Sequence, residues 1–207
     1  MEVNNMNKNF VITIGREYGS GGREVALKLA ELLGVKCYDK DLLTLTAEKK
    51  GVPMEVLNKV DEKKGNIFGA KRASTLPAFD SFGMTNNDRV FMIQSQLIKE
   101  LADEESCVIV GRCADAVLEG RDNVLSVFVT APMESRIARI TERYELSRED
   151  AKKNIARFDK ERGAYYAFYT DKTWGDVNNY HLSVDSSVLG TDGTAEFIKV
   201  LADKKFN

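Results

Sequence analysis

The segment from Gly15 to Glu24, which reads GREYGSGGRE, combines glycines and arginines in a way that suits the binding of an anion. It follows a short apolar run, residues 10–14, and leads into residues 24–33, whose apolar positions have helical spacing. Glycines let a backbone approach an anion closely, and the unpaired N–H groups at a helix N-terminus carry a partial positive charge. The segment therefore indicates a phosphate-binding turn between a strand and a helix.

Other interpretations of this turn stay open. It can be an ordinary tight connection between a strand and a helix. It can also belong to a dinucleotide-binding fold, because Asp39 ends the next apolar run at a suitable distance for a ribose contact. The third glycine of G-x-G-x-x-G, however, is Glu24 here. In a P-loop, G-x-x-x-x-G-K-[ST], the lysine position would hold Gly22.

Phosphoryl transfer needs cations that hold phosphates in line and neutralise the developing charge, so arginines close to glycines are candidates. Arg16 lies in the turn and Arg23 in the first helical turn, and either guanidinium could replace a lysine. Asp39 and Arg112 follow apolar runs, at the edge where open α/β sheets bind ligands. Competing interpretations are ion pairs for the arginines and a capping role for Asp39.

More charged residues have helical spacing in the second half of the chain. Arg136 and Arg139 are three residues apart and share a helix face. Asp159 and Arg162 have the same spacing on the next predicted helix, close to Arg157. Basic residues there could close over a transferring phosphate and exclude water. A solvated surface, or an internal Asp159–Arg162 ion pair, would explain them without a ligand.

Composition narrows the class of protein. The chain has 207 residues, 43% hydrophobic and 30% charged, which suits one domain with its own core. With 30 Lys and Arg against 32 Asp and Glu, it lacks the electrostatic footprint of a nucleic-acid or membrane-surface binder. Its apolar runs are too short for a membrane span. Three cysteines without a CxxC pair indicate a cytoplasmic protein with reduced thiols, and the single histidine, His181, argues against structural zinc.

Short unbroken apolar runs alternate with helical patterns along the chain. Strands are expected at 10–14, 35–38, 106–110, 125–129 and 180–184, and helices at 24–33, 41–50, 89–102, 133–144, from the N-cap Ser147 to about 167, and 194–203. This alternation predicts a parallel sheet of about five strands, covered by helices on both faces. Residues 60–87 are less regular and are predicted to form a mobile loop or a small inserted subdomain.

Four segments in order, ITIGREYGSGGREVALKLAELLGVKCYDKDLL, VIVGRCAD, VFVTAP and YHLSVDSS, resemble the cytidylate kinase-like family of P-loop proteins. The resemblance spans nearly the whole chain. It implies an α/β fold: a three-layer P-loop domain of the nucleoside monophosphate kinase type over residues 1–207. An acceptor-binding insert is then expected at about 40–105 and a lid at about 145–175. The family carries a lysine in its loop and an aspartate after Gly-Arg, where this chain has Gly22 and Cys113.

The resemblance implies ATP-dependent phosphorylation of a nucleoside monophosphate, with CMP or dCMP expected first, and with ATP and Mg²⁺ as cofactors. No residue is assigned as a metal ligand. Because the loop lysine is missing, a nucleotide- or anion-binding protein without turnover, and a kinase of another small metabolite, are the alternatives. Small nucleotides are the expected partners, without nucleic acid or membrane, and the phenylalanines of residues 60–87 are a candidate homodimer contact.

The resemblance and the spacing together assign the candidate residues to three roles. The catalytic candidates are Arg16, Asp159 and Arg162. The candidates for the phosphates and base of ATP are Gly19, Ser20, Gly21, Gly22, Arg23, Glu24, Arg136 and Arg139. The candidates for the acceptor are Asp39, Arg112 and Arg157.

Overall fold

The protein is known from a computed structural model, which describes residues 9–39 and 86–207. These residues contain one sheet with the strand order β2-β3-β1-β4-β5, in which all neighbouring strands are parallel. The strands are β1 (Val11–Arg16), β2 (Lys36–Tyr38), β3 (Cys107–Val110), β4 (Val124–Thr130) and β5 (Leu182–Asp185). The predicted parallel sheet of about five strands is confirmed.

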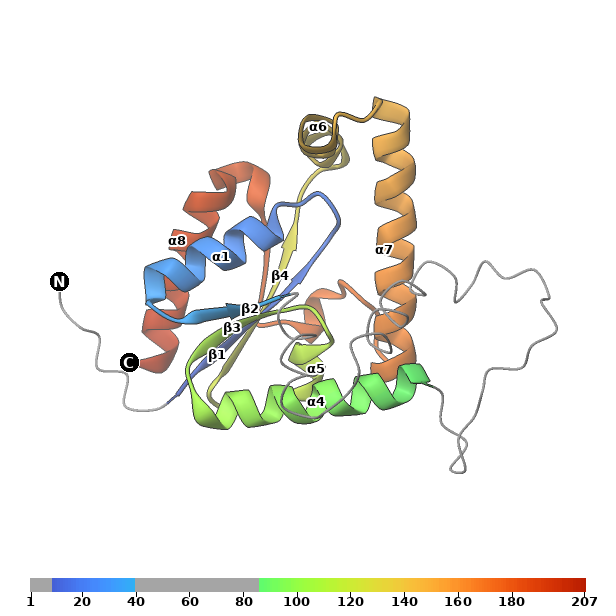
Figure 1. The fold of residues 1–207 in the computed structure, drawn as a ribbon. Coiled ribbons are helices and arrows are strands. Elements are labelled where there is room, and N and C mark those ends of the chain that lie inside the picture. The colour runs from blue at the N-terminus through green and yellow to red at the C-terminus, as the bar shows by residue number, and fades with distance from the viewer. Residues whose placement is uncertain (1–8, 40–85) are drawn as a thin grey trace. The chain divides into compact units, whose positions relative to one another are not determined.

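Helices alternate with these strands (Figure 1). They are α1 (Gly22–Leu33), α4 (Asn86–Glu104), α5 (Ala114–Val117), α6 (Met133–Tyr144), α7 (Arg148–Thr170) and α8 (Ser186–Phe206), with a short 3-10 helix, η2 (Val177–Asn179). The chain divides into two compact units, residues 1–39 with 101–207, and residues 40–100. The sheet lies in the first unit, and so does every contact discussed below.

The core forms because the strands are apolar on both faces. Ile12 and Ile14 of β1 pack with Leu29 of α1 and Ile198 of α8, and none of the four is exposed to solvent. Figure 1 shows α1 and α8 together on one side of the sheet. The short α5 lies on the connection from β3 to β4 and contacts β1. Since parallel crossovers are right-handed, the connections out of β1 and β3, which run in opposite directions along the sheet, cover opposite faces.

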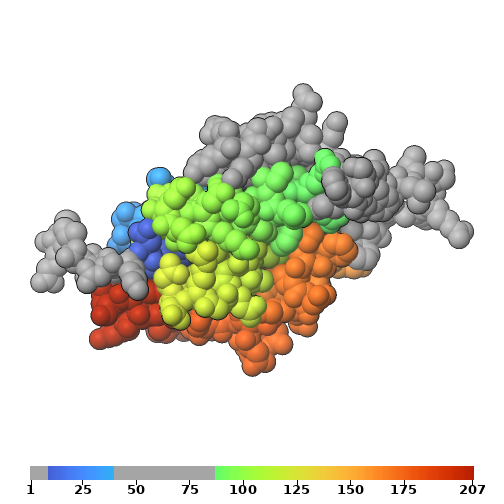
Figure 2. All heavy atoms as spheres, turned by 90° about the horizontal axis from the view of Figure 1, so that it is seen from below, coloured from blue at the N-terminus to red at the C-terminus, as the bar shows by residue number. Residues whose placement is uncertain are grey.

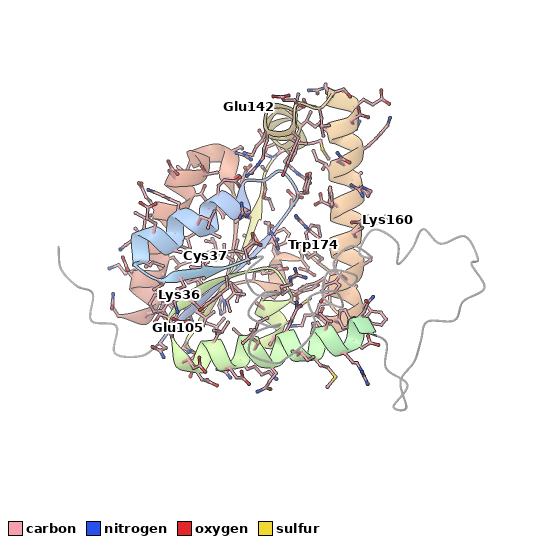
Figure 3. The ribbon with its side chains drawn as sticks, in the orientation of Figure 1. Lys36, Cys37, Glu105, Glu142, Lys160 and Trp174 are labelled. Atoms are coloured by element: carbon pink, nitrogen blue, oxygen red, sulfur yellow. The ribbon has the colours of Figure 1, made fainter. Side chains whose placement is uncertain are left out.

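Polar contacts close the amino end of the β2–β3 pair. Lys36 Nζ lies 2.9 Å from an oxygen of Glu105, both labelled in Figure 3. The Tyr38 hydroxyl donates to the same carboxylate. Burial, and then this hydrogen bond, raises the pKa of Tyr38 to about 12. The phenol therefore stays protonated and donates at all physiological pH values.

The long helix α7 is tied to the rest of its unit at its C-terminal end. The Tyr166 hydroxyl donates to Asp115 at 2.7 Å, and Lys172 Nζ lies 2.5 Å from Glu119. The two segments that these contacts join, residues 115–119 and 166–172, lie side by side in Figure 2. Trp174, labelled in Figure 3, packs edge-on against Phe128 of β4 with ring centroids 5.3 Å apart. Together they fix the position of α7 beside the sheet.

Most element boundaries follow the sequence pattern. Ser147 caps α7 by accepting from the Asp150 amide at 3.1 Å, as expected, and the helix continues to Thr170, beyond the predicted end. The final helix begins at Ser186 rather than at 194, because the side chain of Asp185 caps a first turn that Gly190 then interrupts (φ 68°, ψ 178°). The short α5 was not predicted. The helix expected at 41–50, and residues 60–85 of the irregular segment, lie outside the described residues.

None of the helices in residues 9–39 and 86–207 is long and apolar enough to cross a membrane.

Candidate active site

The strand order puts a topological switch point, where open α/β sheets form their ligand-binding crevice, at the carboxyl ends of β1 and β3. These strands are neighbours, but the chain leaves β1 toward β2 on one side and leaves β3 toward β4 on the other. Open α/β sheets bind ligands at such a switch point. Three sequence-predicted residues lie there, because Arg16 ends β1, Asp39 follows β2, and Arg112 follows β3. The fold thus brings together residues that are up to 96 positions apart in the sequence.

The carbonyl groups of the loop between β1 and α1 are engaged in hydrogen bonds. Every carbonyl from Arg16 to Gly21 accepts a hydrogen bond. The donors, in order, are Arg162 Nη1 (3.1 Å), Ser20 Oγ (3.0 Å), Arg136 Nε (2.8 Å), Arg139 Nη1 (2.7 Å), Ser186 Oγ (2.5 Å) and the Val25 amide (3.0 Å). Since a carbonyl oxygen repels an anion, fixing these oxygens elsewhere makes the loop more receptive to phosphate.

Several amide groups of this loop, unlike its carbonyls, make no hydrogen bond with the described residues. The amides of Gly19, Gly21, Arg23 and Glu24 have no acceptor among the described residues. Those of Arg23 and Glu24 belong to the first turn of α1, where a helix leaves its N–H groups unpaired and its dipole is positive. Unpaired amides beside withdrawn carbonyls are what a phosphate-binding loop requires.

Two glycines set the shape of the loop. Gly19 and Gly21 have φ values of 83° and 79°, a left-handed region that costs other residues about 1 kcal/mol or more. A Cβ at Gly21 would also lie 2.8 Å from Thr191 Cγ2 and 3.1 Å from Arg139 Cζ. The loop conformation therefore depends on glycine at this position for both backbone and steric reasons.

Arg136 of α6 contacts the loop backbone and two carboxylates. Its side chain is 5% exposed, and Nη1 lies 3.2 Å from Glu17 while Nη2 pairs with Asp159. The other Asp159 oxygen accepts from the Tyr18 amide at 2.7 Å, and the second Glu17 oxygen accepts from the Ala131 amide at 3.1 Å. Arg136 and Asp159, predicted to contact ATP and to act in catalysis, thus contact the loop backbone and each other, with Glu17 as a third member.

Four arginines gather around the crevice: Arg16, Arg23, Arg112 and Arg162, the arginine cluster. Burial, and next the charge of Arg162, lowers the pKa of Arg16 to about 9, and Arg112 and Arg23 act in the same direction. Burial also lowers the pKa of Arg162. Both remain cations at pH 7, so the cluster holds positive charge at a cost that a bound anion would relieve.

Asp39 is the acidic member of this crevice and partly offsets the arginine cluster. One of its oxygens lies 2.6 Å from Arg23 Nε, and the other lies 4.0 Å from Arg16 Nη2. Its side chain is only 15% exposed, so these pairs are shielded from solvent screening on the Asp39 side. Among the described residues, the charges of Asp159 and Glu24 also act on this cluster, on Arg162 and Arg23 respectively.

The turn after β3 is strained where it enters the crevice. Gly111, Arg112 and Cys113 have consecutive positive φ values of 73°, 59° and 54°. Left-handed conformations at two non-glycine residues cost about 1–3 kcal/mol each, and such strain persists where surrounding structure imposes it. Cys113 is buried at the N-cap of α5, which fixes Arg112 beside β1.

The side chains of three predicted residues make their contacts outside the arginine cluster. Glu24 pairs with Arg143 of α6, and Arg139 donates to the Gly19 carbonyl. The side chain of Arg157 is 54% exposed, 3.9 Å from Glu161, and stacks 4.3 Å from the Phe158 ring centre. In the part of the chain that the structure describes, the ion-pair partner of Arg157 is Glu161 and not a group at the arginine cluster. Glu17 and Ser186 were missed by sequence reasoning, because no local pattern shows which distant backbone groups they contact.

Residues 11–188 match the model of the cytidylate kinase-like family. The chain belongs to this family. Family and fold make it a nucleoside monophosphate kinase-like phosphotransferase with a P-loop kinase sheet.

Relatives of this cytidylate kinase-like protein support the assignment. Cytidylate kinase of Methanopyrus kandleri is 28% identical over 204 residues, covering 93% of each chain. Cytidylate kinase of Methanosarcina mazei is 25% identical over 198 residues, covering 93% of this chain and 96% of the relative.

Two solved structures resemble this cytidylate kinase-like fold. An uncharacterized protein from Eubacterium ventriosum has a TM-score of 0.71 at 27% identity, covering 94% of this chain and 99% of the other. Shikimate kinase from Acinetobacter baumannii, solved with shikimate, has a TM-score of 0.53 at 16% identity and 98% coverage of both chains. The second likeness concerns the fold alone.

Proposed function

We propose that this protein transfers the γ-phosphate of ATP to a nucleoside monophosphate, with CMP or dCMP as the preferred acceptor. The observation that carries the proposal is the loop after β1, whose carbonyls from Arg16 to Gly21 are all bonded elsewhere while the amides of Gly19, Gly21, Arg23 and Glu24 lack acceptors in the described residues. Such a loop binds the phosphates of the donor. The names of the relatives from Methanopyrus kandleri and Methanosarcina mazei favour cytidylate as the acceptor.

In this proposal the arginine cluster works between donor and acceptor. A phosphate oxygen of the monophosphate attacks the γ-phosphorus, the bond from that phosphorus to the β,γ-bridging oxygen breaks, and ADP leaves with the bond electrons. The protein contributes position and charge, since phosphoryl transfer requires little else. The amides hold the donor phosphates, Arg112 holds the acceptor phosphate, and Arg162 lies on the helix assigned to the lid.

The family also implies a divalent metal, and Asp39 is the group in the crevice that suits Mg²⁺. Mg²⁺ in kinases keeps several waters and takes one or two carboxylates together with substrate phosphates. Asp39 directly follows β2, and its bond to Arg23 would have to open for the carboxylate to hold a metal ion. Bound Mg²⁺ would supply charge neutralisation on the phosphates, while the protein's arginines orient them.

The first test measures ADP release with ATP, Mg²⁺ and a panel of acceptors that includes CMP, dCMP, UMP, AMP and shikimate. CMP or dCMP is expected to give the largest kcat/KM. Gly21→Ala is expected to remove the thermal stabilisation by ATP, because its Cβ would meet Thr191 and Arg139.

Gly34→Ala is the matched control. Gly34 has a similar φ of 67° with open space around it, so that this variant should keep its ATP response. Unchanged ATP stabilisation of Gly21→Ala would reject the loop as the donor site. ATP binding with no turnover of any acceptor would favour the alternative of a nucleotide-binding protein without kinase activity. Turnover of shikimate alone would favour the alternative of a kinase that acts on another small metabolite.

A second test separates the arginines assigned to the acceptor. Arg112→Ala is expected to raise the KM for the acceptor about 10- to 100-fold with a smaller effect on ATP, since a hydrogen bond to a charged group contributes about 1.5–3 kcal/mol. Arg157 occupies a half-exposed position against Phe158, so Arg157→Ala is expected to change the KM for the acceptor less than threefold, roughly the effect of a surface substitution. Titrating both nucleotides against both variants measures this. Equal losses in both variants would place the acceptor elsewhere.

A further inference from the structure

The P-loop spacing reveals an exchange of residues in this chain. In G-x-x-x-x-G-K-[ST] the first glycine stands six positions before the lysine. With Gly21 as the second glycine, the first-glycine position holds Arg16 and the lysine position holds Gly22. A glycine and a cation have therefore changed places across the loop.

The structure gives a steric reason for this exchange. Arg16 ends β1, and alternation along the strand directs its side chain to the same face as Ile12 and Ile14, toward α1. Gly22 is the first residue of α1, and a Cβ there would lie 2.5 Å from Arg16 Cβ and 3.1 Å from its Cγ. Cβ atoms do not approach so closely, so positions 16 and 22 cannot both carry side chains in this backbone.

The guanidinium of Arg16 lies against a second glycine. A Cβ at Gly111, directly after β3, would overlap Arg16 Nη1. The side chain therefore runs past Gly22 and ends against Gly111, in the crevice between β1 and β3. There it lies beside Asp39 and within the field of Arg23, Arg112 and Arg162. The Arg16 side chain as a whole retains 22% exposure.

We propose that Arg16 supplies the phosphate-binding charge of the missing P-loop lysine, that Gly22 is glycine because the Arg16 side chain occupies the space of its Cβ atom, and that Gly111 leaves room for the guanidinium in this position. The proposal deepens the proposed function and rests on it. A guanidinium offers two parallel donors to phosphate oxygens where an ammonium offers a point charge. From the β1–β3 crevice, Arg16 reaches the phosphates from the acceptor side of the loop.

The experiment exchanges the two positions back. Four proteins are compared: wild type, Arg16→Gly, Gly22→Lys, and the double variant Arg16→Gly/Gly22→Lys. Inorganic tripolyphosphate is titrated by calorimetry, and ADP release with the best acceptor is measured in parallel. Arg16→Gly is expected to bind tripolyphosphate at least about tenfold more weakly and to turn over about 1,000-fold more slowly. Gly22→Lys is expected to lose affinity although it adds a cation, because its side chain meets Arg16.

The double variant decides the matter. Removing the Arg16 side chain opens the space for a lysine at position 22, so the double variant is expected to bind tripolyphosphate within about threefold of wild type, the range of a surface substitution. Arg16→Lys should keep part of the affinity, because it preserves the charge without the bidentate geometry. Circular dichroism and melting temperatures show whether each variant is folded.

Two results would overturn the proposal: a double variant that binds no better than Arg16→Gly, or a folded Gly22→Lys that binds more tightly than wild type. If wild type turned over no acceptor, the proposed function would fail, while the tripolyphosphate titration would still support or reject the role of Arg16.

Discussion

Arg136→Met is expected to lower the free energy of unfolding by about 3 kcal/mol, at the lower end of the cost of breaking a buried ion pair, because its carboxylate partners keep some solvent contact. The Arg136 side chain is 5% exposed, and its loss leaves the carboxylates of Glu17 and Asp159 and the Tyr18 carbonyl without their shared donor. Urea unfolding followed by circular dichroism measures the change. ATP stabilisation should fall as well, because the loop loses the group that withdraws one of its carbonyls.

Arg148→Met is the matched control for this prediction. Arg148 also pairs with a carboxylate, Glu134, but both side chains are well exposed, at 65% and 71%. Exposed pairs contribute about 0–1 kcal/mol, so this variant should unfold nearly as wild type does. Similar losses of unfolding free energy in Arg136→Met and Arg148→Met would show that the contacts of Arg136 with Glu17 and Asp159 do not stabilise the fold.

A double-mutant cycle with Asp159→Asn adds a sharper criterion. Because Arg136 and Asp159 contact each other and the same residue, Tyr18, the double variant should lose less than the sum of the single losses, by about 1–3 kcal/mol. Additive losses would mean that the two residues act independently of one another.

Gly111→Ala is expected to reduce kcat/KM by about 100-fold or more, since a misplacement of about 1 Å in a catalytic group has this effect. The added Cβ would overlap Arg16 Nη1 and displace the guanidinium from the crevice. ADP release with the best acceptor, together with tripolyphosphate titration, measures the effect on rate and on anion affinity.

The control for Gly111→Ala is Gly120→Ala. Gly120 has a similar φ of 79°, and a Cβ there would meet nothing within 4 Å. Both variants therefore carry the strain of a left-handed alanine, about 1 kcal/mol, and only one of them displaces Arg16. If both kept the same activity, the contact between Gly111 and Arg16 would have no part in catalysis.

The order of strands and helices in the described residues could be predicted from the sequence, because it depends on short-range patterns. Unbroken apolar runs such as CVIV and VLSVFVT suit strands that are buried on both faces, and Ser147 provides a local cap for α7. The glycines of the loop were also informative, since Gly19 and Gly21 adopt conformations that other residues avoid. The resemblance to a family added the P-loop type of fold, whereas the strand order came only from the structure.

The partners of the charged side chains were decided by the tertiary structure. Spacing on one helix suggested an Asp159–Arg162 pair, yet Asp159 pairs with Arg136 from α6, and Arg162 donates to the carbonyl of Arg16, 146 residues earlier. Helical periodicity specifies which residues share a face, but not which distant element that face meets. A buried carboxylate takes the donor that packing brings to it, and packing depends on the whole sheet.

For Arg16, the sequence predicted the role of the side chain, and the tertiary structure decided its position. Its sequence position made it a candidate for the missing lysine, because it is a cation inside a glycine-rich turn. Its path past Gly22 to Gly111 follows only from the parallel pairing of β1 with β3, which brings the ends of two strands about 95 residues apart into register. The sequence determined that a cation and glycines stand near a phosphate-binding turn. The tertiary structure determined which glycines make room for it, since steric exclusion acts between neighbours in space and not along the chain.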